Sequence, residues 1–187
     1  TDATDAKDSA APEALVPKVL LIGIDGLRGD ALASADTPSM DRMIDEGAWS
    51  LTASTQLASA TVSGPGWTSM LTGVDSDKHG ISMNGGYTEI NRFYPTLIGR
   101  AHELGLSTAT AIYWIPIQMS LIESGSIDEF MLGDDDPITE AMVRMLQEGA
   151  HDVHFLALDD VDYAGHRSAF VPEEPSYRAA VEVADAQ

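Results

Sequence analysis

The chain has 187 residues, and 30 acidic against 10 basic side chains give it a formal net charge of −20. Hydrophobic residues make up 44% of the chain, enough to close the core of one domain or a large part of one, which excludes disorder of the whole chain. The negative charge repels phosphate backbones and anionic lipids, so it argues against nucleic-acid binding and against membrane binding through a basic patch. No apolar run approaches the ~18 to 20 residues of a membrane span. The absence of cysteine excludes disulfides, zinc–thiolate sites and cysteine nucleophiles.

The N-terminal segment 1–17 is acidic, rich in small residues and interrupted by proline. Such a composition is typical of a flexible leader or linker left after a targeting segment is removed, and a trimmed terminus explains it equally well. We therefore expect a folded domain over 18–187 and a periplasmic or secreted protein.

The remaining elements follow in chain order. The unalternating apolar run 18–25 predicts a central strand of a parallel sheet. Proline and glycine signals around amphipathic patterns predict helices over 37–47, 95–105 and 136–149. Strand-like runs over 106–114 and 152–158 follow the second and third of these helices. This alternation predicts an α/β fold with helices on both faces of a mainly parallel sheet.

The last segment, 172–187, predicts a helix that no strand follows. A doubly wound sheet usually continues with a strand after such a helix. We therefore expect this chain to be the front portion of a larger domain.

Polar residues gather where the first strand ends and where a helix begins after it. Asp25 ends the first strand, where a carboxylate can bind a cation above the sheet or simply form a turn. Ser63 precedes Gly-Pro-Gly at a predicted helix start. Free amides and the helix dipole there favour a phosphoryl group or the Ser63 alkoxide, and plain capping of the helix explains the serine equally well.

A third cluster directly follows the run 152–158. Asp162 and His166 are four residues apart, so on one helical turn both can face a single metal ion. Asp159 and Asp160 add negative potential that helps to hold a cation, and the alternative is a solvated acidic loop. Together with Ser63, these residues suit metal-assisted transfer through a covalent serine intermediate.

Five ordered blocks carry a family resemblance. They are Val-Leu-Leu-Ile-Gly-Ile-Asp-Gly at 19–26, Thr-Pro-Ser-Met-Asp-Arg-Met-Ile-Asp-Glu-Gly at 37–47, Ser-Gly-Pro-Gly-Trp-Thr-Ser-Met-Leu-Thr-Gly at 63–73, Asp-Lys-His-Gly-Ile at 77–81 and Asp-Tyr-Ala-Gly-His at 162–166. From about residue 18 to its end the chain resembles the alkaline phosphatase superfamily, and within it the type I phosphodiesterase/nucleotide pyrophosphatase branch.

The resemblance implies a three-layer α/β/α sandwich and a site with two zinc ions. Asp25 and the nucleophile Ser63 would bind one ion, and Asp162 and His166 the other. Asn84 falls where diesterase relatives place a donor to a phosphoryl oxygen, and otherwise it would be a turn residue. The mixed oxygen and nitrogen ligands suit zinc but leave manganese and iron open.

The chain also departs from the family pattern. Relatives complete the two metal sites with a later Asp-His pair and one further histidine, which no residue after His166 supplies. Three explanations follow: the chain is a fragment, which we expect; a second segment or chain completes the site; or the protein is a non-catalytic metal-binding relative.

Two further positions bear on the substrate. Trp67 replaces the arginine that anchors the nucleophile in sulfatases, which argues against sulfatase-like activity. No lysine or arginine lies between Glu103 and Arg144 to bind the extra charge of a monoester. We therefore expect hydrolysis of small phosphodiester or pyrophosphate substrates, with a phosphomonoesterase or sulfatase-like ester hydrolase as the alternative.

The aromatic residues carry the last expectations. Trp67 and Trp114 could form an apolar wall that binds the leaving group, although aromatic side chains more often pack in cores. Trp49, in a strand-like run, is expected in the core. His79, next to Gly80, is expected to be structural rather than a metal ligand.

Overall fold

The structure, a computed structural model, describes residues 17–50, 53 and 61–187. Its centre is a four-stranded sheet in the order β1-β4-β2-β3, and every neighbouring pair is parallel. The strands are β1 (Val19–Ile24), β2 (Thr108–Ile112), β3 (Glu129–Leu132) and β4 (Val153–Leu158). Three of them occupy the predicted runs, whereas β3 was not predicted.

Helices account for most of the remaining described chain. They are α1 (Gly29–Leu32), α2 (Pro38–Glu46), α3 (Ser63–Thr72), α4 (Ser76–His79), α5 (Leu97–Glu103), α6 (Asp135–Glu148), α7 (Asp160–Arg167) and α8 (Pro175–Ala186). A 3₁₀ turn, η1 (Tyr87–Glu89), and a π-helical turn, η2 (Ile117–Leu121), complete them. The helices expected over 37–47, 95–105, 136–149 and 172–187 are confirmed as α2, α5, α6 and α8.

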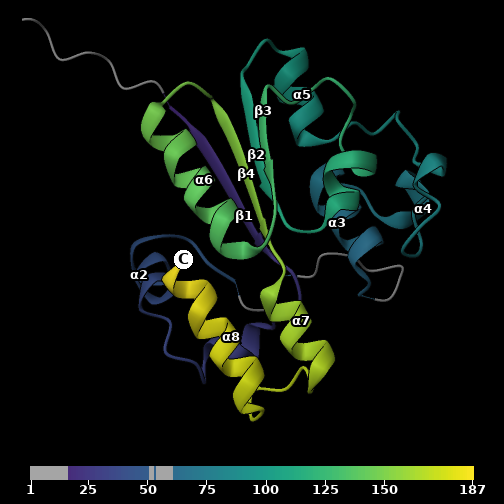
Figure 1. The fold of residues 1–187 in the computed structure, drawn as a ribbon. Coiled ribbons are helices and arrows are strands. Elements are labelled where there is room, and N and C mark those ends of the chain that lie inside the picture. The colour runs from purple at the N-terminus through teal and green to yellow at the C-terminus, as the bar shows by residue number, and fades with distance from the viewer. Residues whose placement is uncertain (1–16, 51–52, 54–60) are drawn as a thin grey trace, which may run out of the picture.

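The sheet is covered on both faces, as Figure 1 shows for α6 on one side and α3 and α5 on the other. Successive side chains of β4 point to opposite faces, as the pleat requires. Phe155 and Ala157 pack in one core cluster with residues of α3 and α5, and Leu156 and Leu158 pack in the other with residues of α6 and α8. The predicted three-layer α/β/α sandwich is therefore confirmed.

The position of β1 differs from the prediction. Within the described residues β1 pairs only with β4, so it lies at an edge of the sheet rather than in its centre. Its apolar side chains Val19, Leu20 and Ile22 are 56%, 41% and 42% exposed. An unalternating apolar run predicts burial of both faces of a strand, but it does not determine how many strands pair with it.

The start of helix α2 is held by a side chain from α8, near the other end of the chain. The side chain of Thr37 does not cap it, and Asp185 of α8 accepts hydrogen bonds from the amides of Ser39 and Met40 instead, at 3.0 and 2.7 Å. A carboxylate at this end favours the helix through both its hydrogen bonds and its charge.

Shortly after α2, Trp49 is 60% exposed and outside any strand, so the prediction that it lies in the core is wrong.

Two expectations concern regions beyond this core. Residues 1–16 of the predicted leader lie outside the described residues. Within the described part of the chain, none of the helices combines the length and apolar character needed to cross a membrane.

Candidate metal and nucleophile site

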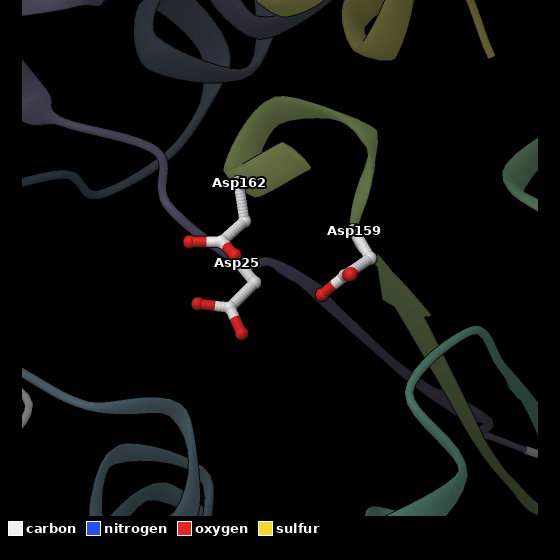
Figure 2. Close-up of side chains that lie close together, drawn as sticks. All are labelled: Asp25, Asp159 and Asp162. Atoms are coloured by element: carbon white, nitrogen blue, oxygen red, sulfur yellow. The ribbon is translucent and has the colours of Figure 1, made fainter. Parts of the chain in front are cut away.

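Three carboxylates meet at the carboxyl edge of the sheet. Asp25 follows β1 and Asp159 follows β4, and these strands are paired in register up to Ile24 opposite Leu158. Asp162 comes from the first turn of α7. One carboxylate oxygen of each aspartate lies within 4.8 Å of the others, and Figure 2 shows the three side chains gathered around one space.

The electrostatics of this cluster favour a cation. Burial, and then the charges of Asp25 and Asp162, raises the pKa of Asp159 to about 7. Burial and Asp25 also raise the pKa of Asp162, and His166 opposes that shift. Negative charges held together with little water repel one another, and a divalent cation would remove this repulsion. The donor set therefore fits a divalent metal ion.

A buried carboxylate on α6 holds the start of α7. Asp135 is 1% exposed and accepts hydrogen bonds from the amides of Asp159 and Asp160, at 3.0 and 2.9 Å. These amides are at the helix N-terminus, where no partner within the helix exists. Asp135 thereby ties α7, and with it Asp162, to the end of β4.

A cavity of about 570 Å³ lies beside this cluster. Six residues that the sequence singled out line it together: Asp25, Ser63, Trp67, Asn84, Asp162 and His166. They come from α3, α7 and the connections that follow β1 and α4, so the fold brings together segments that are far apart in the sequence.

Ser63 lies at the start of α3. It is the first helical residue, and Val62 occupies the capping position, so capping does not account for this serine. Ser63 lines the cavity at the N-terminal end of the helix, where the helix dipole favours negative charge. This placement suits an oxygen nucleophile.

The free amides that we expected at this helix start are mostly in use. The amide of Gly64 donates to Oδ1 of Asn84 at 2.6 Å, and that of Gly66 donates to the carbonyl of Val62 at 2.9 Å. Pro65, between them, has no N–H. Little anion binding is therefore left to the backbone of this turn, and the charge of an anion must be met mainly by other groups.

The same hydrogen bond orients Asn84. Because its Oδ1 accepts from Gly64, its Nδ2 amino group remains as the donor on the cavity side. Gly64 is needed for this contact, since a Cβ there would lie 3.0 Å from Oδ1 of Asn84 and 2.9 Å from the carbonyl oxygen of Met83. The arrangement suits a donor to a substrate oxygen.

The other predicted residues lie in differing places. His166 lines the cavity with its side chain 73% exposed, and its Nε2 is 3.4 Å from Oδ2 of Asp162. Trp67 lines the cavity but is only 6% exposed. Trp114 is not among the lining residues, and it packs edge to face on Tyr87. His79 is fully buried and accepts a hydrogen bond from the amide of Ile81 at Nδ1.

Sequence reasoning assigned Asp159 only a contribution to the local potential. The structure places its carboxylate within the cluster itself. The signal that could have identified it is its position directly after β4, because a residue that ends one parallel strand lies beside the residue that ends the neighbouring strand.

The family profile described as type I phosphodiesterase/nucleotide pyrophosphatase matches residues 19–187. The chain belongs to this family. As a type I phosphodiesterase/nucleotide pyrophosphatase family member, it also belongs to the alkaline phosphatase superfamily.

Solved structures share the fold of this family member. Murine ectonucleotide pyrophosphatase/phosphodiesterase 5 in complex with AMP aligns with a TM-score of 0.64 at 16% identity, over 91% of this chain and 50% of that one. Phosphonoacetate hydrolase from Sinorhizobium meliloti, in complex with phosphonoacetate, gives 0.63 at 14% identity over 91% and 52%. Phosphonate monoester hydrolase from Agrobacterium radiobacter gives 0.61 at 16% identity over 76% and 40%.

These likenesses bear on the fold and on length. The chain spans about half the length of the murine phosphodiesterase and of the phosphonoacetate hydrolase. No match was found among curated proteins.

Proposed function

We propose that the full-length protein is a metal-dependent hydrolase that cleaves phosphodiester or pyrophosphate bonds through a covalent phosphoserine intermediate. The observation that carries the proposal is the convergence of Asp25, Ser63 and Asp162 on one cavity at the carboxyl edge of the sheet. Family membership supports the reaction class. The domain that begins near residue 18 is proposed as part of its catalytic domain.

The proposed metal ligands are those that the resemblance implies. Asp25 and Ser63 would hold one divalent cation, and Asp162 and His166 a second. Asp159 would add its charge to those of Asp25 and Asp162. Two zinc ions suit this mixture of oxygen and nitrogen donors. When bound, they would supply Lewis-acid stabilisation of the attacking and leaving oxygens.

The protein's own residues account for the remaining steps. The hydroxyl of Ser63 loses its proton and Oγ attacks phosphorus, so that the Oγ–P bond forms while the bond from phosphorus to the leaving oxygen breaks and the leaving group departs as its anion or takes up a proton. Nδ2 of Asn84 donates to a non-bridging phosphoryl oxygen, where negative charge develops. A water molecule then attacks phosphorus, the Oγ–P bond breaks, and Ser63 is restored with release of the phosphate product.

The charge of the cavity supports a diester over a monoester. Arg28 is the one lysine or arginine among the described lining residues, and its guanidinium pairs with Asp30 at 2.6 Å. A paired cation offers little compensation for the second charge of a monoester. Trp67 contributes an apolar ring to the same lining, where a base or aryl leaving group would fit.

A periplasmic or secreted location is also proposed. The composition of segment 1–17 supports it, as does the name of the murine ectonucleotide pyrophosphatase whose fold is similar. Its test is fractionation of the source cells with an antibody against the protein. Recovery from the periplasm or medium is expected, and recovery from the cytoplasm alone would contradict this location.

The test of the proposed activity uses the zinc-loaded full-length protein. An aryl phosphodiester, the matching monoester and the matching sulfate ester are compared as substrates, with Ser63→Ala as the variant and Ser124→Ala, an exposed serine, as its control. We expect the wild type to hydrolyse the diester faster than the monoester and the sulfate ester. We expect kcat/KM for the diester to fall more than about 1,000-fold in Ser63→Ala and to stay unchanged in Ser124→Ala. Full activity in Ser63→Ala would contradict the mechanism, and a monoester preference would indicate the phosphomonoesterase alternative.

A further inference from the structure

The indole of Trp67 contacts the carboxylate that ends β1. Trp67 lies one helical turn after Ser63 on α3, and its Nε1 donates to Oδ2 of Asp25 at 2.9 Å. Oδ1 of the same carboxylate accepts from the amide of Gly26 at 2.9 Å. Each oxygen of Asp25 thus has one protein donor, which determines the orientation of the carboxylate.

The ring has a fitted place on the sheet. A Cβ at Gly23 would lie 2.5 Å from two ring carbons of Trp67, so this position in β1 has room only for glycine. The indole also meets Phe155 of β4 edge to face, with ring centroids 5.9 Å apart. The side chain is 6% exposed, so its N–H does not exchange freely between Asp25 and solvent.

The indole N–H is a suitable hydrogen-bond donor for orienting a metal-binding carboxylate. The indole N–H donates and does not accept, so it orients Asp25 without competing for a cation as a histidine would. It is also neutral, so Asp25 keeps its full charge for the metal. Hydrogen bonds to metal ligands from neighbouring residues commonly change metal affinity by about 10- to 100-fold.

We propose that Trp67 is a positioning residue that fixes Asp25 relative to Ser63, so that both can bind the same divalent cation. It does so by joining the helix that begins with Ser63 to the strand that ends at Asp25. The inference rests on the proposed function and deepens it, because it assigns the residue at position 67 to the metal site rather than only to the substrate.

The experiment measures zinc binding to the metal-free full-length protein by calorimetry, together with kcat and KM for an aryl phosphodiester. Trp67→Phe removes the donor, and Trp114→Phe is the matched control because that ring packs edge to face on Tyr87 and is not among the residues that line the cavity. We expect zinc affinity to fall about 10- to 100-fold in Trp67→Phe and to stay within about twofold in Trp114→Phe. For the aryl phosphodiester, we expect kcat to fall in Trp67→Phe with little change in KM.

A second variant separates hydrogen bonding from packing. Replacing Trp67 with β-(3-benzothienyl)alanine keeps the size of the ring but removes its N–H, and we expect the same loss of zinc affinity as in Trp67→Phe. Wild-type affinity in this variant would overturn the role of the N–H. If the wild type binds zinc and hydrolyses the diester, and both Trp67 variants keep its zinc affinity and kcat, this inference alone would be overturned. A wild type that does neither would overturn the proposed function as well.

Discussion

Gly26 lies directly against the backbone of Asp162: a Cβ on Gly26 would be 2.6 Å from the Cα of Asp162 and 3.0 Å from its amide nitrogen. Gly26 also has a φ of +71°, which side-chain-bearing residues rarely adopt. The loop after β1 and the first turn of α7 can therefore approach closely enough for the carboxylates of Asp25 and Asp162 to lie in one cluster.

Gly26→Ala should separate these two carboxylates. We expect zinc affinity to fall at least about tenfold, as for other disturbed ligand positions, and stability to fall by more than about 1 kcal/mol. Gly73→Ala is the control, since Gly73 has the same φ of +71° but no atom within 4 Å of an added Cβ. Equal loss of zinc affinity in the two variants would contradict the role of the close approach.

Tyr177 of α8 holds the same loop. Its hydroxyl donates to the carbonyl of Gly26 at 2.7 Å and accepts from the amide of Arg28 at 3.1 Å, and its side chain is fully buried. Tyr177→Phe leaves both backbone groups without this partner, so urea denaturation should show a loss of about 1–3 kcal/mol. Tyr163→Phe, at a 53% exposed position, should change stability by less than about 0.5 kcal/mol. Equal stabilities would contradict the role of Tyr177.

Asp159 should make the metal-free protein sensitive to pH. Its pKa is raised from 3.8 to about 7, so between these values the folded protein holds a proton that the unfolded chain has released. The resulting stability is complete below about pH 3.8 and is lost as the pH rises through about 7. We therefore expect a lower Tm at about pH 8 than at about pH 5, and a smaller decrease in Asp159→Asn.

Zinc binding checks the same group independently. A cation that binds beside Asp159 favours its charged form, so binding at about pH 6 should release a proton. Calorimetry in buffers of different ionisation enthalpy measures this release. Its absence would contradict the raised pKa and the place of Asp159 in the site.

Ser69 provides a contrast with Ser63. Its hydroxyl lies 2.9 Å from Nε2 of His79, and Nδ1 of that ring accepts from the amide of Ile81 at 3.1 Å. The proton of the ring is therefore on Nε2, which donates to Ser69 and cannot act as its base. Burial also lowers the pKa of His79, which keeps the ring neutral. Ser69→Ala should cost about 1–3 kcal/mol of stability while kcat is kept, and a kcat that fell as far as in Ser63→Ala would contradict this assignment.

Most of the α/β architecture could be predicted from the sequence because its strongest patterns are local. The buried strand β4 is apolar at every position except His154, and α6 has a proline near its start and a glycine after its end. Strand β3 was missed because it has only four residues, and an apolar run as short as Phe-Met-Leu does not by itself distinguish a strand from a piece of helix or loop.

The residues that gather at the cavity could be named from the sequence, but their hydrogen-bond partners could not. Asp25, Ser63 and Asp162 are marked by their places at element ends. The hydrogen bond from Trp67 to Asp25 and the capping of α2 by Asp185 join residues that are far apart in the sequence. Such pairings depend on how the layers pack, which no local pattern contains.

The central claim is that Ser63 forms a covalent bond to phosphorus. The direct measurement is to mix the zinc-loaded full-length protein with an aryl phosphodiester, quench with acid during turnover, and examine the peptide containing Ser63 by mass spectrometry. We expect a phosphoryl adduct on Ser63 that disappears when the substrate is exhausted and is absent from Ser63→Ala. Steady turnover of the diester by Ser63→Ala, with no adduct on the wild-type peptide, would contradict it.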